Sequence, residues 1–157
     1  MERDWLHLSA HYFPLGRSQV TVGSESSDVL TGARPTLVVV EDEEVIGLSL
    51  QASLDEAGFA VQLFSDATAV LASIDRIAIA GAIIDVGLPG MRGDELARLC
   101  RARLPTLPII LATGYDEARY ASSVAADPLL AVLEKPFDMP RLLIRLESLG
   151  VYAGRDS

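Results

Sequence analysis

The stretch "TLVVVEDEE" (residues 36–44) decides the fold, because an uninterrupted apolar run meets four acids. Residues 36–40 are β-branched or aliphatic with no alternating polar positions, which is typical of a parallel strand covered on both faces. The acids follow at once, at the point where such a strand would end. The stretch therefore predicts a buried strand whose carboxyl end carries negative charge.

Outward from this strand, apolar runs alternate with segments of helical spacing. Helix 43–59, with apolar residues at Val45, Leu48, Ala52 and Leu54, ends at the glycine signal Gly58. Further strands are expected at 60–64, 80–85, 108–113 and 129–134. Further helices are expected at 66–75, 93–104 and 139–150, with another within about 116–126. Five strand–helix alternations predict an α/β domain, a parallel sheet with helices on both faces.

The domain organisation follows from length and local composition. A chain of 157 residues is about one domain in size. Residues 1–34 lack a sustained apolar period, so we expect an N-terminal extension that is either flexible or a partner-binding segment, rich in bulky residues over "DWLHLSAHYF" (4–13). Residues 35–150 hold the alternation, and residues 151–157 are expected to be a C-terminal tail. No room remains for an output domain after residue 150, so a single-domain protein is expected.

Charge and composition narrow the class of partner. The net charge of −9 argues against a nucleic-acid partner, which requires a cationic face. No apolar run is long enough to cross a bilayer and no signal peptide is present, which also argues against a membrane partner. The lone Cys100 suits a reducing cytoplasm and is expected to be a small, semi-buried apolar residue on a helix. We therefore expect a cytoplasmic protein, a monomer or weak dimer, that works through protein contacts.

Chemically active side chains gather where the predicted strands end. Glu41 and Asp42 follow the first strand, Asp85 ends the third, Thr113 the fourth, and Lys135, the only lysine, follows the fifth. Ligands of open parallel sheets bind at this edge. Clustered carboxylates repel one another unless a cation separates them, and Mg²⁺ prefers such oxygen ligands. With Mg²⁺, a hydroxyl and an ammonium to hold the oxygens of a phosphoryl group, one carboxylate could act as its acceptor.

Each of these features alone also has an ordinary structural explanation. The acidic run 41–44 could be a solvated helix start, Thr113 could cap a turn, and Asp85 could form a side-chain turn ahead of "VGLPGMRG". These explanations do not account for the joint placement at the ends of four strands in one sheet.

Four motifs in the right order resemble the receiver domain of two-component response regulators. They are "LVVVEDE" (37–43), "AIIDVGLPGMRGDEL" (82–96), "ILATGY" (110–115) and "LEKPF" (133–137), and the resemblance covers about residues 35–150. It implies the flavodoxin-like (βα)5 fold, a three-layer α/β/α arrangement with strand order 2-1-3-4-5. It also implies phosphoryl transfer from the phosphohistidine of a sensor histidine kinase or phosphotransfer protein, then slow hydrolysis catalysed by the receiver itself.

The resemblance assigns a role to each acidic position. Asp85 would be the phosphoacceptor and a metal ligand. Asp42 would bind Mg²⁺ directly, Glu41 through water, and Gly87 through its backbone carbonyl.

The two remaining site residues would face the phosphoryl group. Thr113 would donate a hydrogen bond to it and Lys135 would pair with it, resting against a carboxylate when phosphate is absent. The resemblance further implies that the Lys135–Pro136 bond is cis.

One position departs from the family pattern. The usual aromatic switch lies three residues before the lysine, and here that residue is Val132, expected in the core. Tyr115, two residues after Thr113, is the switch candidate, although it could simply cover the mouth of the site. The stretch is similar to the "FAT GUY" alphaproteobacterial receivers, with Leu111 in place of Phe, which implies a kinase of the HWE or HisKA2 type.

Three functions compete at this point. The first is a receiver that accepts a phosphoryl group on Asp85 and acts as an output, a relay or a phosphate sink. The second is a pseudo-receiver, an adaptor that binds a partner protein without phosphorylation, which the intact site residues disfavour. The third is a flavodoxin-like enzyme or nucleotide binder, which the lack of a Gly-rich phosphate loop after the first strand disfavours.

Overall fold

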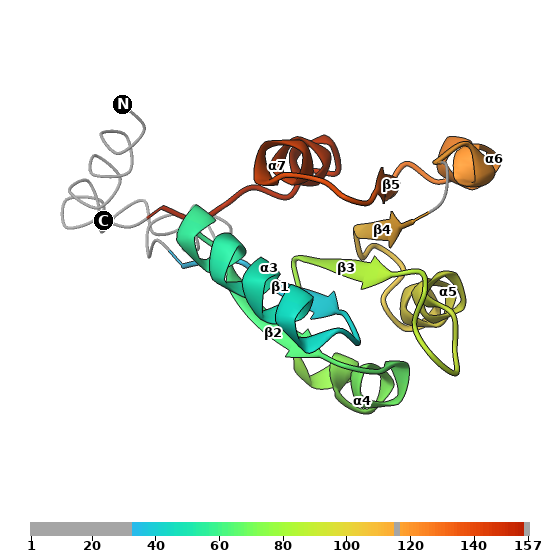
Figure 1. Ribbon diagram of the computed structural model, residues 1–157, viewed down its shortest axis with the longest axis horizontal. Coiled ribbons are helices and arrows are strands. Elements are labelled where there is room, and N and C mark those ends of the chain that lie inside the picture. The colour runs from blue at the N-terminus through green and yellow to red at the C-terminus, as the bar shows by residue number, and fades with distance from the viewer. Residues whose placement is uncertain (1–32, 115–116, 156–157) are drawn as a thin grey trace, which may run out of the picture.

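The computed structural model describes residues 33–114 and 117–155, so the predictions for residues 1–32 and for Tyr115 lie outside it. Five parallel strands form one sheet in the order β2-β1-β3-β4-β5 (Figure 1). The strands are β1 (Thr36–Val40), β2 (Ala60–Phe64), β3 (Gly81–Asp85), β4 (Ile109–Thr113) and β5 (Leu130–Glu134). This confirms the expected flavodoxin-like fold and its strand order.

The helices form close to where their periodicity predicted them. They are α3 (Glu44–Ala57), α4 (Ala67–Ser73), α5 (Gly93–Arg103), α6 (Ala121–Ala126) and α7 (Met139–Ser148), with short 3-10 turns η2 (Ile74–Arg76) and η3 (Glu117–Tyr120). Asp66 and Asp138 cap α4 and α7 by accepting hydrogen bonds from backbone N–H groups of the first turn. Gly58 ends α3 with φ +108°, a left-handed conformation that glycine adopts without strain.

Two apolar cores fill the space on either face of the sheet. Along β1, Val38 and Val40 pack with α4, α5 and α6 on one face, whereas Leu37 and Val39 pack with α3 and α7 on the other. Successive side chains of a strand point to opposite faces, so a strand between two cores must be apolar at every position. This explains the unbroken run 36–40.

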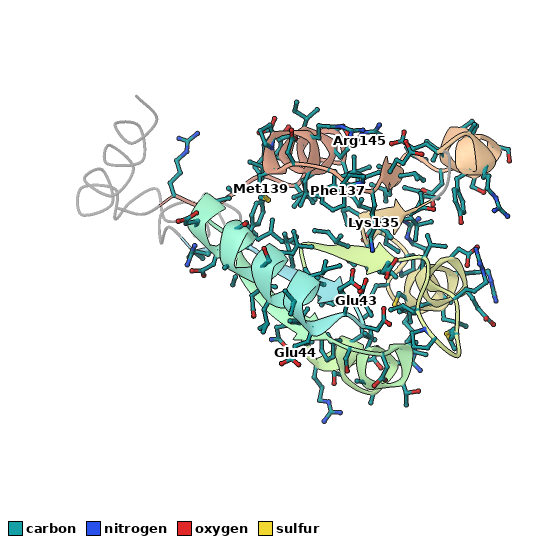
Figure 2. The ribbon with its side chains drawn as sticks, viewed as in Figure 1. Glu43, Glu44, Lys135, Phe137, Met139 and Arg145 are labelled. Atoms are coloured by element: carbon teal, nitrogen blue, oxygen red, sulfur yellow. The ribbon has the colours of Figure 1, made fainter. Side chains whose placement is uncertain are left out.

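Helix α3 differs from the expected pattern in which residues it buries. Only Gly47 and Leu54 of this helix are buried, whereas Val45 and Leu48 are 81% and 50% exposed. Glu43 and Glu44 lie at the start of the helix (Figure 2). Val45 and Leu48, in the first half of α3, therefore face outward.

The two ends of the described chain meet at the C-terminal end of α3. Arg34 forms an ion pair with Asp55, and Gly154 N–H donates a hydrogen bond of 3.0 Å to the Gly58 carbonyl. Val151 is buried in the core shared by α3 and α7. Within the described residues, no helix has both the length and the hydropathy needed to cross a membrane.

Candidate functional site

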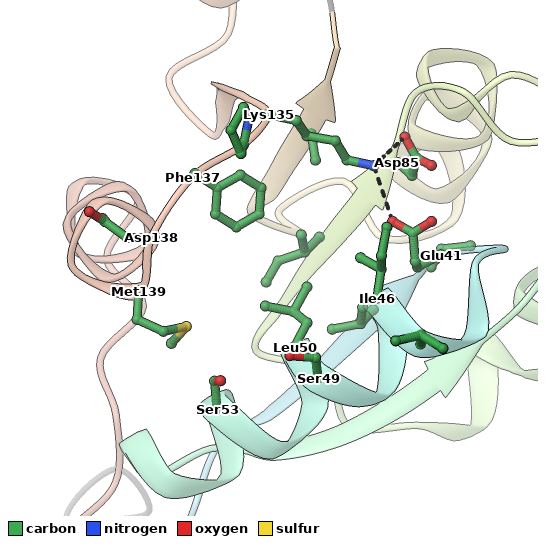
Figure 3. A pocket seen from close by; sticks show the side chains of 16 residues that line it. Glu41, Ile46, Ser49, Leu50, Ser53, Asp85, Lys135, Phe137, Asp138 and Met139 are labelled. Carbon is green, nitrogen blue, oxygen red and sulfur yellow. Dashed lines mark hydrogen bonds and ion pairs between the residues drawn. The ribbon is translucent and has the colours of Figure 1, made fainter.

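The predicted site residues meet at the carboxyl edge of the sheet. Glu41 follows β1, Asp85 ends β3, Thr113 ends β4 and Lys135 follows β5. Because all four strands are parallel and adjacent in the order β1-β3-β4-β5, their ends lie at one edge. Figure 3 shows the Lys135 side chain extending toward Asp85 and Glu41.

Lys135 links two carboxylates from different strands. Its Nζ lies 3.1 Å from Glu41 Oε2 and 3.2 Å from Asp85 Oδ1. Glu41 is 5% exposed and Asp85 is 8% exposed, so little solvent screens these contacts. Carboxylates this buried need a paired cation, and Lys135 supplies it.

Burial and the contacts between charged groups act in opposite directions on the pKa values of Glu41 and Lys135. Burial is the largest influence on Glu41 and raises its pKa, although the Glu43 N–H and Lys135 both act against it. Burial also acts most strongly on Lys135, where it lowers the pKa, but the combined contacts with Glu41 and Asp85 outweigh it and the pKa lies above its usual value. Lys135 is therefore protonated and positively charged at physiological pH.

The backbone also orients Asp85. The Gly87 N–H donates a hydrogen bond of 3.0 Å to Asp85 Oδ1, the same oxygen that contacts Lys135. Gly93 approaches from the following helix, since its N–H bonds the Val86 carbonyl at 2.9 Å. The loop between β3 and α5 thus holds one carboxylate oxygen of Asp85 through the Gly87 N–H.

Three acids are close enough to share a metal ion. Carboxylate oxygens of Glu41, Asp42 and Asp85 lie within 4.8 Å of one another, and Asp42 is the exposed member. An all-oxygen donor set with one solvent-facing carboxylate fits Mg²⁺, which retains several water ligands. The residues present therefore fit this metal.

Thr113 is held at the same edge of the sheet by a backbone hydrogen bond. It is fully buried, and its carbonyl accepts a hydrogen bond of 2.7 Å from the Lys135 N–H. The Lys135–Pro136 peptide bond is cis, as the resemblance implied. The ends of β4 and β5 are therefore held together where Thr113 and Lys135 stand.

Comparison with known proteins identifies the family. Residues 37–147 match the model of the response regulator receiver domain. The chain belongs to this family. It is 34% identical over 112 residues to the transcriptional regulatory protein FixJ of Bradyrhizobium diazoefficiens, a match covering 71% of this chain and 55% of FixJ. It is 33% identical to the C4-dicarboxylate transport transcriptional regulatory protein DctD of Rhizobium meliloti, over 71% of this chain and 24% of DctD.

Solved receiver structures have the same fold. A receiver protein of Sinorhizobium medicae superposes with a TM-score of 0.65 at 28% identity, over 73% of this chain and 93% of that one. The response regulator TrrA of Thermotoga maritima, solved in complex with Mg²⁺–BeF, has a TM-score of 0.65 at 26% identity, over 73% and 98% of the two chains. This chain thus spans a quarter to about half of the curated regulators above but nearly all of these solved receivers.

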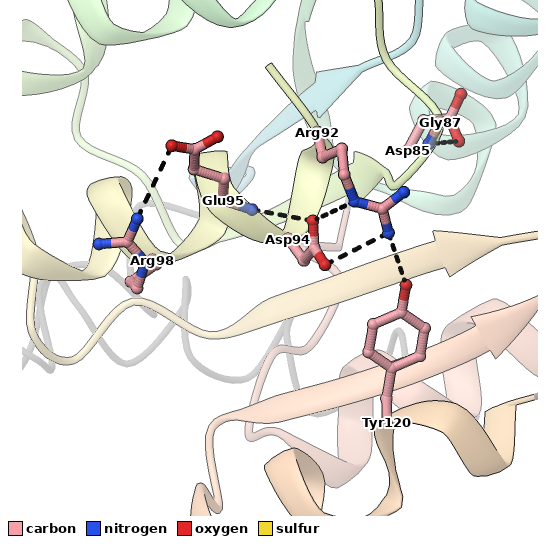
Figure 4. A network of polar contacts seen from close by, with 7 residues as sticks. All are labelled: Asp85, Gly87, Arg92, Asp94, Glu95, Arg98 and Tyr120. Atoms are coloured by element: carbon pink, nitrogen blue, oxygen red, sulfur yellow. Dashed lines mark hydrogen bonds and ion pairs between the residues drawn. The ribbon is translucent and has the colours of Figure 1, made fainter.

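The receiver also contains a polar link that the sequence did not suggest. Arg92, on the loop after Asp85, donates a hydrogen bond of 3.3 Å to the Tyr120 hydroxyl and forms an ion pair of 3.1 Å with Asp94 (Figure 4). Tyr120 packs in the same core as Val132. Nothing in the stretch "EARYASS" (117–123) distinguishes this tyrosine from an ordinary core residue, so sequence reasoning could not have paired it with Arg92.

Two other expectations about this receiver can be compared with the structure. Val132 is 2% exposed and so is a core residue, as predicted. Cys100 is 1% exposed and therefore lies deeper than the semi-buried position expected for it. The role of Tyr115 as a switch lies outside the described residues. Arg92 and Tyr120 connect the loop after Asp85 to the segment that follows β4.

Proposed function

We propose that this receiver accepts a phosphoryl group on Asp85 and signals through protein contacts. The observation that carries the proposal is the position of Lys135, whose ammonium lies 3.1 and 3.2 Å from Glu41 and Asp85. A mobile point charge on a flexible stem can leave a carboxylate and follow a new phosphoryl oxygen, whereas the planar fork of arginine suits bidentate pairing.

The geometry suggests how Asp85 would react. Its Oδ1 accepts contacts from the Gly87 N–H and Lys135, so we assign Oδ2 as the nucleophile. In the transfer, the bond from Oδ2 to phosphorus forms as the bond from phosphorus to the donor's imidazole nitrogen breaks, and that nitrogen keeps the electron pair. Lys135 and the Thr113 hydroxyl would each stabilise one oxygen of the phosphoryl group.

Asp42 and Asp85 would hold Mg²⁺ directly, with Glu41 acting through water and the Gly87 carbonyl completing the protein ligands. The metal would supply charge neutralisation for the transferring phosphoryl group. The solved relative TrrA, in complex with Mg²⁺–BeF, supports this assignment by similarity.

The narrower assignments stay predictions. They are the single-domain architecture, the "FAT GUY" subtype with an HWE or HisKA2 kinase, the switch role of Tyr115 and the cytoplasmic location. Partnership with a histidine kinase or a phosphotransfer protein follows from the receiver family itself.

Phosphorylation from a small donor tests the proposal directly. The full chain is incubated with Mg²⁺ and acetyl phosphate, and its mass is compared with that of Asp85→Asn. We expect one acid-labile phosphoryl group on the wild type and none on the variant. A wild-type protein that gains no phosphoryl group and no Mg²⁺-dependent spectral change with beryllofluoride would instead support the phosphorylation-independent adaptor.

A further inference from the structure

An apolar groove begins beside the acceptor and runs along α3. It has a volume of about 640 Å³ and lies between α3 and the segment from Lys135 into α7. Figures 2 and 3 both show Phe137 and Met139 on the side of α7 that faces α3. Ile46 and Leu50 line the opposite wall, and Asp85 and Lys135 lie at one end. The groove therefore offers an apolar surface that ends at the acceptor.

Part of this groove is formed by apolar side chains that are exposed to solvent. Val45 and Ile46, which both line it, are 81% and 42% exposed. They project from the first turn of a helix whose second half is packed in the core through Leu54. Contiguous exposed apolar side chains along a groove mark a binding surface.

The chain carries a segment with matching chemistry ahead of residue 33. Residues 4–13 read "DWLHLSAHYF" and hold the only tryptophan of the protein. Trp5, Leu8 and Tyr12 are spaced i, i+3 and i+7, the spacing by which a peptide presents one apolar edge to a groove between helices. The residues between this segment and the described chain, 14–32, are rich in Gly, Ser and Thr.

Residues 14–32 are long enough to let the N-terminal segment reach the groove along α3. The described chain begins at the C-terminal end of α3, where Gly154 packs against the backbone of Ala33 and Arg34. Helix α3 has 14 residues and so spans about 21 Å. A Gly/Ser-rich chain of about 19 residues that behaves as a random coil has a root-mean-square end-to-end distance of about 24 Å. The effective concentration of the tethered segment at the groove is highest when these two lengths match, and it then reaches the millimolar range. Even weak contacts would therefore keep the segment bound.

We propose that residues 5–13 bind intramolecularly in the groove between α3 and α7. Trp5, Leu8 and Tyr12 then cover the exposed Val45 and Ile46. The groove that the segment occupies ends at Asp85 and Lys135. The inference does not depend on phosphorylation, since it concerns the apolar wall and the chain's own N-terminal segment.

The intrinsic fluorescence of Trp5 in the full chain tests this binding. We expect wild-type emission to be shifted to the blue of the urea-unfolded chain and acrylamide quenching to be several-fold weaker. Val45→Glu and Ile46→Glu place a charge in the groove, and each should return emission and quenching to the unfolded values. Circular dichroism and thermal unfolding verify that both variants stay folded.

Leu48→Glu is the matched control, because Leu48 is 50% exposed on the same helix but does not line the groove. It should leave the fluorescence of Trp5 at its wild-type value. Wild-type emission equal to that of the unfolded chain, or groove variants with unchanged emission, would overturn the proposal. A blue shift that vanishes on dilution would also overturn it, since a second copy of the chain would then supply the tryptophan.

Discussion

At the scale of single residues, the ammonium of Lys135 and a metal ion would compete for the same carboxylates. Glu41 Oε2 and Asp85 Oδ1 both contact Lys135 Nζ, and both residues belong to the acidic cluster. A divalent ion that binds there must displace the lysine or tolerate its charge nearby. Lys135 therefore weakens metal binding while it stabilises the metal-free site.

Replacement of Lys135 should strengthen Mg²⁺ binding. We expect Lys135→Met to bind Mg²⁺ about tenfold more tightly, equivalent to about 1.4 kcal/mol, as followed by the amide resonance of Gly87 at about pH 8, where free carboxyl groups are ionised. Arg141→Met is the control, because its guanidinium contacts Glu117, which lies outside the cluster. Equal affinities in wild type and Lys135→Met would show that the lysine does not compete.

The lone thiol gives the protein a pH dependence of its own. Burial raises the pKa of Cys100 to about 11, with nearby Arg103 acting weakly in the opposite direction. The unfolded chain loses this proton near pH 9, so the raised folded pKa contributes stability that is present below that pH and is lost as pH rises toward 11. At about 1.36 kcal/mol per pKa unit, the loss is about 2–3 kcal/mol.

We therefore expect the free energy of unfolding of the wild type to fall more steeply over this range than that of Cys100→Ala. Urea unfolding at several pH values measures both slopes. Parallel slopes would show that Cys100 does not titrate differently in the folded and unfolded chains.

At the scale of elements, the loop between β3 and α5 depends on a close backbone approach. A Cβ atom placed on Gly93 would lie 2.0 Å from the Asp85 carbonyl oxygen and 2.8 Å from the Cα atom of Val86. Neither neighbour is a flexible side chain, so the backbone of the acceptor strand would have to move. Glycine at this position holds α5 against the end of β3.

Substitution of Gly93 should accordingly destabilise the domain. We expect Gly93→Ala to lower the free energy of unfolding by about 2–3 kcal/mol, the upper range for added volume in a packed site. Gly114→Ala is the control, since a Cβ there meets nothing within 4 Å, and its effect should stay within about 0.5 kcal/mol. Chemical denaturation compares the two, and equal losses would refute the role of the close approach.

The elements also show which sequence signals were reliable. The strands β1, β3, β4 and β5 were predictable because their apolar runs pack into two cores at once. The starts of α4 and α7 were predictable because Asp66 and Asp138 cap them. The helix expected within about 116–126 is the six-residue α6, preceded by the turn η3. Few large apolar residues lie there apart from Tyr120, so tertiary contacts rather than periodicity decide this segment.

At the scale of the whole molecule, the candidate site was predictable because adjacent parallel strands all end at the same edge of the sheet. Residues that follow these strands are therefore brought together. Glu41, Asp85, Thr113 and Lys135 are far apart in the chain, yet each stands at the end of a strand in a sheet ordered β1-β3-β4-β5. The burial of individual side chains on α3 could not be predicted in the same way. Whether Val45 and Leu48 face the core or solvent depends on how α3 is rotated against the sheet, which periodicity alone leaves open.

The acidic cluster should also couple metal binding to the stability of the entire domain. Without metal, the exposed Asp42 adds a further negative charge beside Glu41 and Asp85. Like charges this close oppose folding, and the ammonium of Lys135 is already shared between Glu41 and Asp85. A metal that binds only the folded domain offsets this repulsion, with a stabilisation of about 2.7 kcal/mol at a hundredfold excess over its dissociation constant.

Asp42→Asn should therefore change thermal stability in two opposite ways. The melting temperature of the metal-free variant should rise above that of the wild type, because one repelling charge is lost. Addition of Mg²⁺ should raise the melting temperature of the wild type but leave the variant nearly unchanged. Glu44→Gln removes a charge from the same acidic run but outside the cluster, so it should keep the full response to Mg²⁺. A variant Asp42→Asn that responds to Mg²⁺ as strongly as the wild type would place the metal on other ligands.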